Sequence, residues 1–341
     1  MKNSLHYNYV VFNMADGNKL KNNPDGYYTI CVKDLFGMDG VKVVSMPLDQ
    51  ECLLVRLLFS IHTSAKIARY IKLPFKKCWY PRYFRNDFED NKPLCFVIIN
   101  NYISISYLEY LKQTYPTSKI VLLHRDLLAV SNRSNPELPF NKVLDLEMSI
   151  DDNECEEYDM VHFSEFESKT DVPISEDYPL SDVFFAGAEK GRLNKLITAY
   201  DIFAAQGIKC FFYITGVSKE RQVQREGIVY ADKFMPYSKM LYYTINSRCV
   251  LEFNYGAAVG YTSRFLEAVI YGKKLITDNI VIKNTSFFKS GHIQVIANAN
   301  EIDTSFMTTG SDIVDYHYNR EFSPIRLIEQ IDSELTGRYG E

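Results

Sequence analysis

The sequence lacks the features that define several whole classes of protein. No stretch approaches the roughly 18 uninterrupted apolar residues of a membrane-spanning helix, and residues 1–7 contain no apolar segment of a secretory signal. The 7 cysteines stand singly, without a C-x-x-C pair, and most lie in apolar runs, as reduced thiols of cytosolic proteins do. The sequence therefore predicts a cytoplasmic protein without a transmembrane helix or a disulfide framework.

The sequence also lacks an excess of positive charge and a metal-ligand spacing of its histidines. The formal net charge is −5, so the chain lacks the excess of Lys and Arg found on surfaces dedicated to nucleic acid. The 6 histidines show no metal-ligand spacing to one another or to cysteine. We therefore expect no nucleic-acid partner, no bound metal and no cofactor.

What the sequence does contain is a βαβ rhythm that starts twice. A chain of 341 residues with 46% hydrophobic residues is long enough for two domains of roughly 150 residues each. Short apolar runs separated by helix-length segments predict strands at 9–12, 41–45, 95–99, 119–124 and 159–163, and again at 183–186, 209–214, 228–230, 248–253, 274–277 and 293–296. This pattern predicts an α/β protein of two Rossmann-like domains with a cleft between them.

A polar and acidic stretch at residues 165–179 separates the two series and contains Pro173 and Pro179, as an interdomain linker would. We expect an N-terminal domain over 1–170 and a C-terminal domain over 178–310. Residues 311–341 are expected to form a helical tail that packs back on the N-terminal domain.

The segment VFFAGAEKGRLNK at residues 183–195 predicts a strand that ends in glycines and passes into a helix. In a doubly wound sheet such a turn lies at the carboxyl edge of the strand, with the helix N-terminus aimed at whatever binds there. A diphosphate fits this geometry at Gly187, with Arg192 and Lys195 adding positive charge. An ordinary βα turn is the alternative, because the segment matches neither G-x-G-x-x-G nor a Walker loop.

Residues 254–276 carry a second pattern, in which a strand is followed by a loop with Gly256 and Gly260 and then by a helix. The segment FLEAVIYGKKLI at 265–276 resembles the P-L-E-A-x-x-x-G-x-P-V-I signature of GT-B glycosyltransferases and keeps its interval from Glu267 to Gly272. Both prolines of the signature are replaced, by Phe265 and Lys274. The resemblance covers about residues 181–277.

The resemblance implies a nucleotide-diphosphate-sugar donor held by the C-terminal domain. Glu267 would bind the ribose, Thr262 and Ser263 would meet the diphosphate, and Arg264 would reach the phosphate or the sugar. Tyr237, in the segment 234–240, is the candidate for contact with the base. The acidic residue that many retaining members carry eight positions before the ribose glutamate is Val259 here, and Glu252 is a possible substitute.

The N-terminal domain should supply the acceptor site and a general base. His124 and Asp126 lie at the end of one predicted strand, and Asp16 lies in the loop after another. Each also has an ordinary interpretation, since Asp16 precedes Gly17 in a turn dipeptide and Asp126 follows Arg125 as in a surface ion pair.

Residues 52–86 contain no Asp or Glu, but many Lys and Arg between apolar and aromatic residues. Such a stretch suits an anionic membrane surface or the pyrophosphate of a lipid-linked acceptor. RNA contact and a solvated basic face are the alternatives. The interpretation we favour places a peripheral contact with an anionic membrane at residues 56–85.

Together these patterns predict a metal-independent, hexosyltransferase-type glycosyltransferase of bacterial surface polysaccharide assembly, of capsule or lipopolysaccharide. It would act in the cytoplasm or at the inner face of the cell membrane, on a glycan or lipid-linked acceptor. A non-catalytic GT-B-fold binding subunit and a nucleotide-sugar epimerase are the alternatives. A GT-A enzyme is a further one, because residues 145–147 and 151–154 distantly resemble its D-x-D metal motif.

Overall fold

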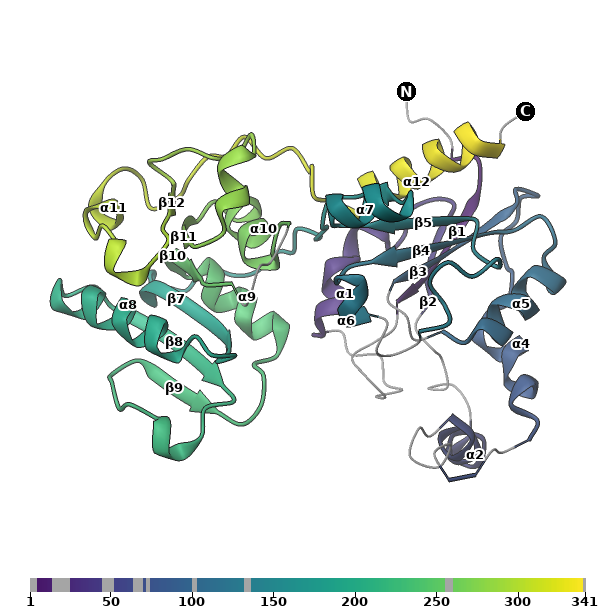
Figure 1. Ribbon diagram of the computed structural model, residues 1–341, viewed down its shortest axis with the longest axis horizontal. Helices are drawn as coiled ribbons and strands as arrows, with labels where there is room; N and C mark the ends of the chain where they lie inside the picture. Colours follow the sequence, from purple (N-terminus) through teal and green to yellow (C-terminus); the bar gives the residue numbers. More distant parts are fainter. Residues whose placement is uncertain are drawn as a thin grey trace. The chain divides into compact units, whose positions relative to one another are not determined.

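The computed structural model describes residues 5–13, 25–44, 52–63, 70–71, 74–99, 103–131, 136–254 and 260–339. Asp16, Gly256 and Val259 lie outside the described residues. The chain forms two compact units, unit 1 with Met1–Phe163 and Pro324–Glu341, and unit 2 with Ser164–Ser323 (Figure 1).

Unit 1 contains a parallel sheet of 6 strands in the order β2-β1-β3-β4-β5-β6. Its strands are β1 (Asn8–Asn13), β2 (Val41–Val44), β3 (Leu94–Ile99), β4 (Lys119–His124), β5 (Leu146–Ser149) and β6 (Val161–His162). Every residue of β3 is buried, as expected for the centre of a parallel sheet with both faces covered.

The helices of unit 1 lie between these strands in the sequence, and α2 stands apart from the sheet (Figure 1). They are α1 (Tyr27–Cys31), α2 (Leu53–Thr63), α4 (Tyr80–Tyr83), α5 (Ile105–Thr114), α6 (Leu128–Ser131) and α7 (Asp152–Tyr158), with 3-10 turns η1 (Lys33–Leu35) and η2 (Lys76–Trp79). The C-terminal helix α12 (Pro324–Tyr339) belongs to this unit, where Asp332 accepts hydrogen bonds from the His6 backbone N–H and the Tyr9 hydroxyl, both at 2.9 Å.

Unit 2 contains a second parallel sheet of 6 strands, in the order β12-β11-β10-β7-β8-β9. The strands are β7 (Ser181–Ala188), β8 (Cys210–Thr215), β9 (Ile228–Ala231), β10 (Ser247–Glu252), β11 (Lys274–Thr277) and β12 (Ile293–Val295). With β7 taken as the first strand, this is the strand order of the Rossmann fold, and the order reverses between β7 and β10. The predicted fold class, two Rossmann-like α/β domains, is confirmed at the level of the two units.

The helices of unit 2 are α8 (Leu193–Ala205), α9 (Tyr237–Ile245), α10 (Ser263–Ile270) and α11 (Ser305–Thr308), with 3-10 turns η3 (Lys219–Arg221), η4 (Ile280–Asn284) and η5 (Ala299–Glu301). Both α8 and α10 match helices expected from the sequence. Helix α10 ends before Gly272, whose φ is +63° and where a Cβ would lie 2.6 Å from the Val314 carbonyl oxygen. Only glycine fits that position.

Within the described part of the chain, no helix combines the length and the apolar character needed to cross a membrane.

Candidate functional site

The reversal of strand order between β7 and β10 is where a Rossmann-type sheet binds its ligand, outside the carboxyl ends of the strands. Arg192, at the start of α8, joins these two ends. Its guanidinium donates to the Ala188 carbonyl at 2.6 Å and to the Phe253 carbonyl, and it lies 5.5 Å from the centre of the Phe185 ring. Burial lowers the pKa of Arg192, while nearby Asp278, Glu252 and Glu189 act in the opposite direction.

Gly187, the predicted diphosphate turn, makes room for this arginine. A Cβ at position 187 would lie 3.3 Å from both Arg192 Nη2 and the ring of Phe185. The glycine therefore permits the close approach of the guanidinium to the end of β7.

Lys195, the second cation expected to meet a phosphate, is also engaged. Its Nζ lies 2.6 Å from Asp278 Oδ2 and 3.2 Å from the Ala297 carbonyl oxygen. The other oxygen of Asp278 accepts from the Asn254 N–H at 2.7 Å. A diphosphate at this edge would thus meet cations that carboxylates and carbonyls already partner.

The end of β10 is tied to the start of α10 through Glu252. This buried carboxyl accepts from the Thr262 hydroxyl and, at 2.6 Å, from the Thr277 hydroxyl. Burial raises the pKa of Glu252, and the hydroxyl donors oppose the shift. The Thr262 oxygen also accepts from the Phe265 N–H at 3.3 Å, so Thr262 caps α10, and Ser263 is the first residue of the helix.

Glu267 lies at the centre of a buried polar cluster. Its side chain is fully buried, forms an ion pair with Arg264, and accepts from the Tyr237 hydroxyl at 2.9 Å and the Thr244 hydroxyl at 3.4 Å. Burial raises the pKa of the Glu267 carboxyl, and Arg264 opposes that rise. The structure therefore brings three of the predicted donor-binding residues, Tyr237, Arg264 and Glu267, into direct contact.

Glu167 completes this cluster from the segment before β7. Its carboxyl is also fully buried and accepts from the same Tyr237 hydroxyl. A phenol has one proton and donates to one acceptor at a time. The Tyr237 hydroxyl therefore donates to either Glu167 or Glu267 at any one time.

The predicted acceptor-side residues lie in unit 1. His124 ends β4 and is buried, with Nε2 at 2.9 Å from Glu147 Oε2 on β5. Within the described residues, its Nδ1 has no hydrogen-bond partner. Asp126 is exposed two residues further on, and Asp16 lies outside the described residues.

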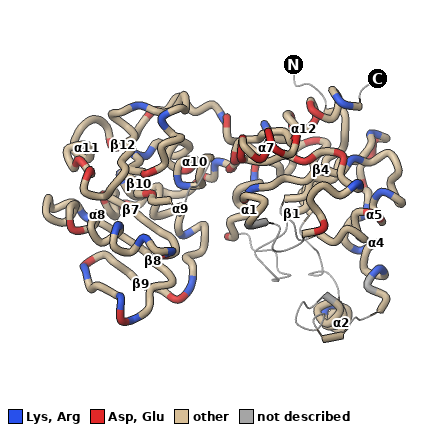
Figure 2. Tube along the Cα trace, in the orientation of Figure 1, with Lys and Arg blue, Asp and Glu red and all other residues tan. Residues whose placement is uncertain are grey.

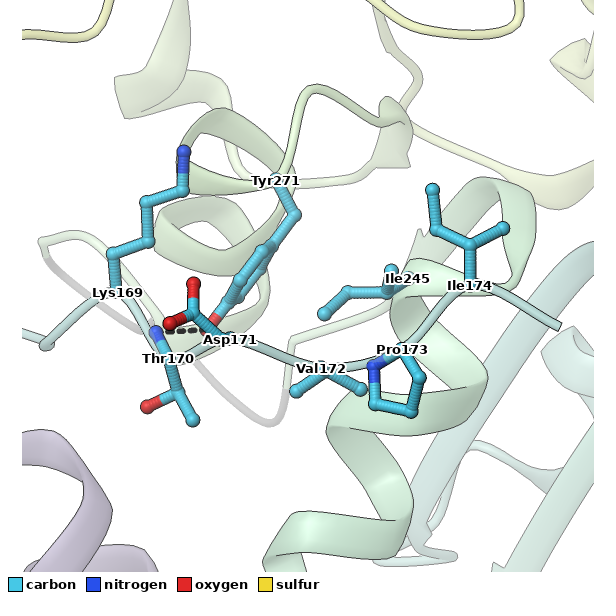
Figure 3. A pocket seen from close by; sticks show the side chains of 8 residues that line it. All are labelled: Lys169, Thr170, Asp171, Val172, Pro173, Ile174, Ile245 and Tyr271. Carbon is cyan, nitrogen blue, oxygen red and sulfur yellow. Dashed lines mark hydrogen bonds between the residues drawn. The ribbon is translucent and has the colours of Figure 1, made fainter.

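A pocket of about 380 Å³ opens elsewhere on unit 2 (Figure 3). Its lining comes from the extended segment 169–174 together with Ile245 and Tyr271, and the Tyr271 hydroxyl accepts from the Thr170 N–H at 3.0 Å. Ile245 ends α9 and Tyr271 follows α10, so the pocket lies where these helices lead into the amino ends of β10 and β11. It is therefore at the opposite edge of the sheet from the strand ends that bind ligands in this fold.

Sequence reasoning missed Glu167 and α9. Glu167 lies in an acidic, proline-containing stretch whose composition indicates solvent, and no sequence pattern marks it as buried. No helix was predicted over Tyr237–Ile245, although Pro236 at its N-cap gives a start signal and the buried Met240, Leu241 and Ile245 form an apolar face.

In the described part of the chain, no group of three or more His, Cys, Asp or Glu side chains is arranged to hold a metal ion.

Comparison with known proteins gives structural but not sequence relatives. No family model matches the sequence, and no curated protein matches it. The α,α-trehalose-phosphate synthase (UDP-forming) from Burkholderia vietnamiensis aligns with a TM-score of 0.51 and 9% identity over 97% of this chain and 99% of that one. Anabaena Alr3699/HepE, solved in complex with UDP and glucose, aligns with a TM-score of 0.50 and 11% identity over 97% and 100%. The chain has the GT-B fold.

A chain of the Gap123 glycosylation-associated complex from Streptococcus agalactiae is also similar, with a TM-score of 0.40 and 10% identity. The alignment covers 73% of this chain and 54% of that one, so this chain spans about half the length of that relative. Identities at this level establish the fold alone.

Proposed function

We propose that this protein is a glycosyltransferase that moves a sugar from a nucleotide-diphosphate-sugar donor to a glycan or lipid-linked acceptor. The observation that carries the proposal is the reversal of strand order in unit 2, where Arg192 contacts the chain at the ends of β7 and β10, and Glu252, at the end of β10, binds Thr262 at the start of α10. Structural relatives of the same fold include a UDP-forming synthase and a protein solved with UDP and glucose.

The proposed chemistry is stabilisation of a departing nucleoside diphosphate. A helix N-terminus carries partial positive charge, and α10 begins at Ser263 directly after the end of β10 and its loop. Arg192 and Lys195 stand at the neighbouring strand ends and would share their charge with the diphosphate. Preorganised cations of this kind can replace a metal, so we propose that transfer is metal-independent.

The general base is proposed among His124, Asp126 and Asp16. A base must lie within hydrogen-bond reach of the acceptor hydroxyl. His124 is oriented by Glu147, and orientation by a carboxylate holds an imidazole in one tautomer. We propose further that the pathway is capsule or lipopolysaccharide synthesis, at the cytoplasmic side of the cell membrane, with a hexose as the transferred sugar.

A non-catalytic GT-B-fold binding subunit is the second candidate. The observation that favours it is that the fully buried Glu267 carboxyl already accepts hydrogen bonds from three protein side chains, those of Arg264, Tyr237 and Thr244. To hold a ribose, this carboxyl must exchange one of these partners for a substrate hydroxyl.

One turnover experiment separates the candidates. The purified protein is incubated with a panel of nucleotide-diphosphate sugars, with and without lipid-linked and free glycan acceptors, and both nucleoside diphosphate and sugar identity are measured. Acceptor-dependent release of nucleoside diphosphate that persists in EDTA is expected. Conversion of the sugar without an acceptor would indicate an epimerase, binding without turnover a subunit, and strict dependence on Mn²⁺ or Mg²⁺ would overturn the metal-independent mechanism.

A further inference from the structure

Helix α2 of unit 1 exposes an aliphatic face. The exposed side chains stand at i, i+1, i+4, i+5 and i+8, which places them on one face of the helix within an arc of roughly 140°. They are Leu53, Leu54, Leu57, Leu58 and Ile61, with exposed fractions of 82%, 64%, 57%, 46% and 39%. An amphipathic helix of a globular protein normally buries such a face against the core. An exposed apolar face of this kind indicates a site that binds a partner or a membrane.

The opposite face of α2 is anchored to the protein. Phe59 is buried against Trp79, with ring centres 5.2 Å apart and ring planes at 89°. The Trp79 Nε1–H donates to His62 Nδ1 at 2.9 Å. These contacts fix the rotation of α2 about its axis. The buried side of the helix is occupied by Trp79, so the aliphatic face on the other side is exposed.

The elements that pack against the opposite face of α2 carry cations. Lys77, Arg82 and Arg85 are exposed on η2, on α4 and just after α4, and Arg82 lies 5.5 Å from the centre of the Trp79 ring. No Asp or Glu occurs from residue 52 to residue 86, and Figure 2 marks only basic charge on α2 and α4. Tyr70 and Phe75 add exposed aromatic side chains, at 83% and 81%.

We propose that α2 is a peripheral membrane-docking helix that lies in the interface of an anionic lipid bilayer. The aliphatic face lies on a stretch of chain, residues 52–86, that carries cations and no Asp or Glu, and this combination matches acyl chains below a layer of negative headgroups. With 11 residues, α2 is about 16 Å long, too short for a hydrocarbon core of about 30 Å, so it lies in the plane of the surface.

A second copy of the chain is the rival occupant. A dimer interface would receive the aliphatic face, but it would bring the cations of one copy close to those of the other, because the stretch provides no carboxylate to pair with them. The charge pattern therefore favours the bilayer. This docking surface is independent of the proposed transferase activity, since lipid binding requires no donor.

The test is flotation of the full-length protein with vesicles of phosphatidylglycerol and phosphatidylcholine, and with vesicles of phosphatidylcholine alone. Wild type should bind the anionic vesicles at low salt and be released by high salt, because surface charges are screened beyond roughly 8 Å at physiological ionic strength. The triple variant Lys77→Gln, Arg82→Gln and Arg85→Gln should lose about fivefold in partitioning for each charge removed. The variant Leu54→Gln with Leu57→Gln should lose on the order of tenfold for each leucine.

The matched control is Lys209→Gln with Lys219→Gln and Lys233→Gln, which removes three exposed charges from unit 2 and should leave binding unchanged. The chain has 1 Trp, so the emission of Trp79 reports whether each variant keeps α2 docked. Failure of wild type to float with anionic vesicles at low salt would overturn the proposal. So would a concentration-dependent dimer that the leucine variant abolishes while vesicle binding is absent.

Discussion

Glu267 and Arg264 form a buried ion pair in which each charge depends on the other. The Glu267 side chain is fully buried and that of Arg264 is 18% exposed, so water cannot replace either partner. Removing one member of a buried pair typically lowers the free energy of unfolding by about 3–5 kcal/mol, because the remaining charge stays buried.

We therefore expect Glu267→Ala to reduce the free energy of unfolding by about 3–5 kcal/mol in urea denaturation. Glu176→Ala, at an exposed glutamate of the same unit, is the control and should change it by less than about 0.5 kcal/mol. Equal stability of the two variants would show that Glu267 is not held in this network. If Glu267 binds ribose, Glu267→Ala also weakens donor binding by about 1.5–3 kcal/mol per hydrogen bond lost.

Glu252 gives a prediction about pH. Burial raises its pKa in the folded state, so between the ordinary glutamate pKa and the raised value the folded protein holds a proton that the unfolded chain has released. The free energy of unfolding therefore falls as pH rises through this window. Glu252→Gln, a neutral isostere, should flatten the fall and make the protein more stable than wild type above the window.

The measurement for Glu252 is urea unfolding from pH 4 to pH 8. Glu329→Gln, at an exposed glutamate paired with Arg326, is the matched control and should follow wild type. A Glu252→Gln curve parallel to that of wild type would mean that this carboxyl titrates normally.

The residues of the candidate site could be predicted from sequence only where local pattern decides position. The strand-to-helix turn at Gly187 and the N-terminus of α10 at Thr262 follow from glycine and capping signals within a few residues. The partners of Arg192, the Phe253 and Ala188 carbonyls, depend on which strands become neighbours. That is a tertiary property, so pairing and burial at the site were not visible in the sequence.

At the scale of elements, α12 is attached to the sheet of unit 1 by Asp332. This carboxylate accepts from the His6 backbone N–H and from the buried Tyr9 hydroxyl, both at 2.9 Å, and lies 2.7 Å from His6 Nδ1. Replacement by alanine leaves the Tyr9 hydroxyl without this acceptor, and an unsatisfied buried donor costs about 1–3 kcal/mol.

We expect Asp332→Ala to lower the free energy of unfolding by about 1–3 kcal/mol and to speed amide hydrogen exchange in α12. Glu329→Ala on the same helix removes only an exposed pair with Arg326 and should cost less than about 1 kcal/mol. Unchanged exchange in Asp332→Ala would mean that apolar contacts alone, such as those of the buried Ile328, Ile331 and Leu335, hold α12.

Strands were predicted from the sequence more completely than helices. Most strands of both sheets are short β-branched and aromatic runs, and each strand predicted in unit 2 is present. Strand β5 of unit 1, with the sequence LEMS, lacks such residues and was not predicted. Helix α9 was missed because its nine residues, YSKMLYYTI, are rich in aromatic and β-branched residues that favour strands. Its helical state follows from packing of its buried face, with Met240 and Leu241, which outweighs local propensity.

At the scale of the whole molecule, the fold is that of GT-B proteins. The repeated βαβ rhythm predicted its two Rossmann-like units, and the resemblance at residues 265–276 implied GT-B. What the rhythm could not give is the order of strands within each sheet. In unit 2 that order, β9-β8-β7-β10-β11-β12, places the reversal beside Gly187 and so locates the proposed donor site.

The central claim is that this edge of unit 2 binds a nucleotide-diphosphate sugar, and calorimetric titration tests it directly. Wild type is titrated with a panel of nucleotide-diphosphate sugars beside the variants Ser263→Asp and Ser263→Ala. An aspartate in the first turn of α10 stabilises the helix through its dipole yet repels a diphosphate. The account predicts that at least one donor binds wild type, that Ser263→Ala retains most of the affinity, and that Ser263→Asp loses at least about tenfold while remaining as stable as wild type. Absence of binding by any donor, or equal affinity of wild type and Ser263→Asp, would contradict it.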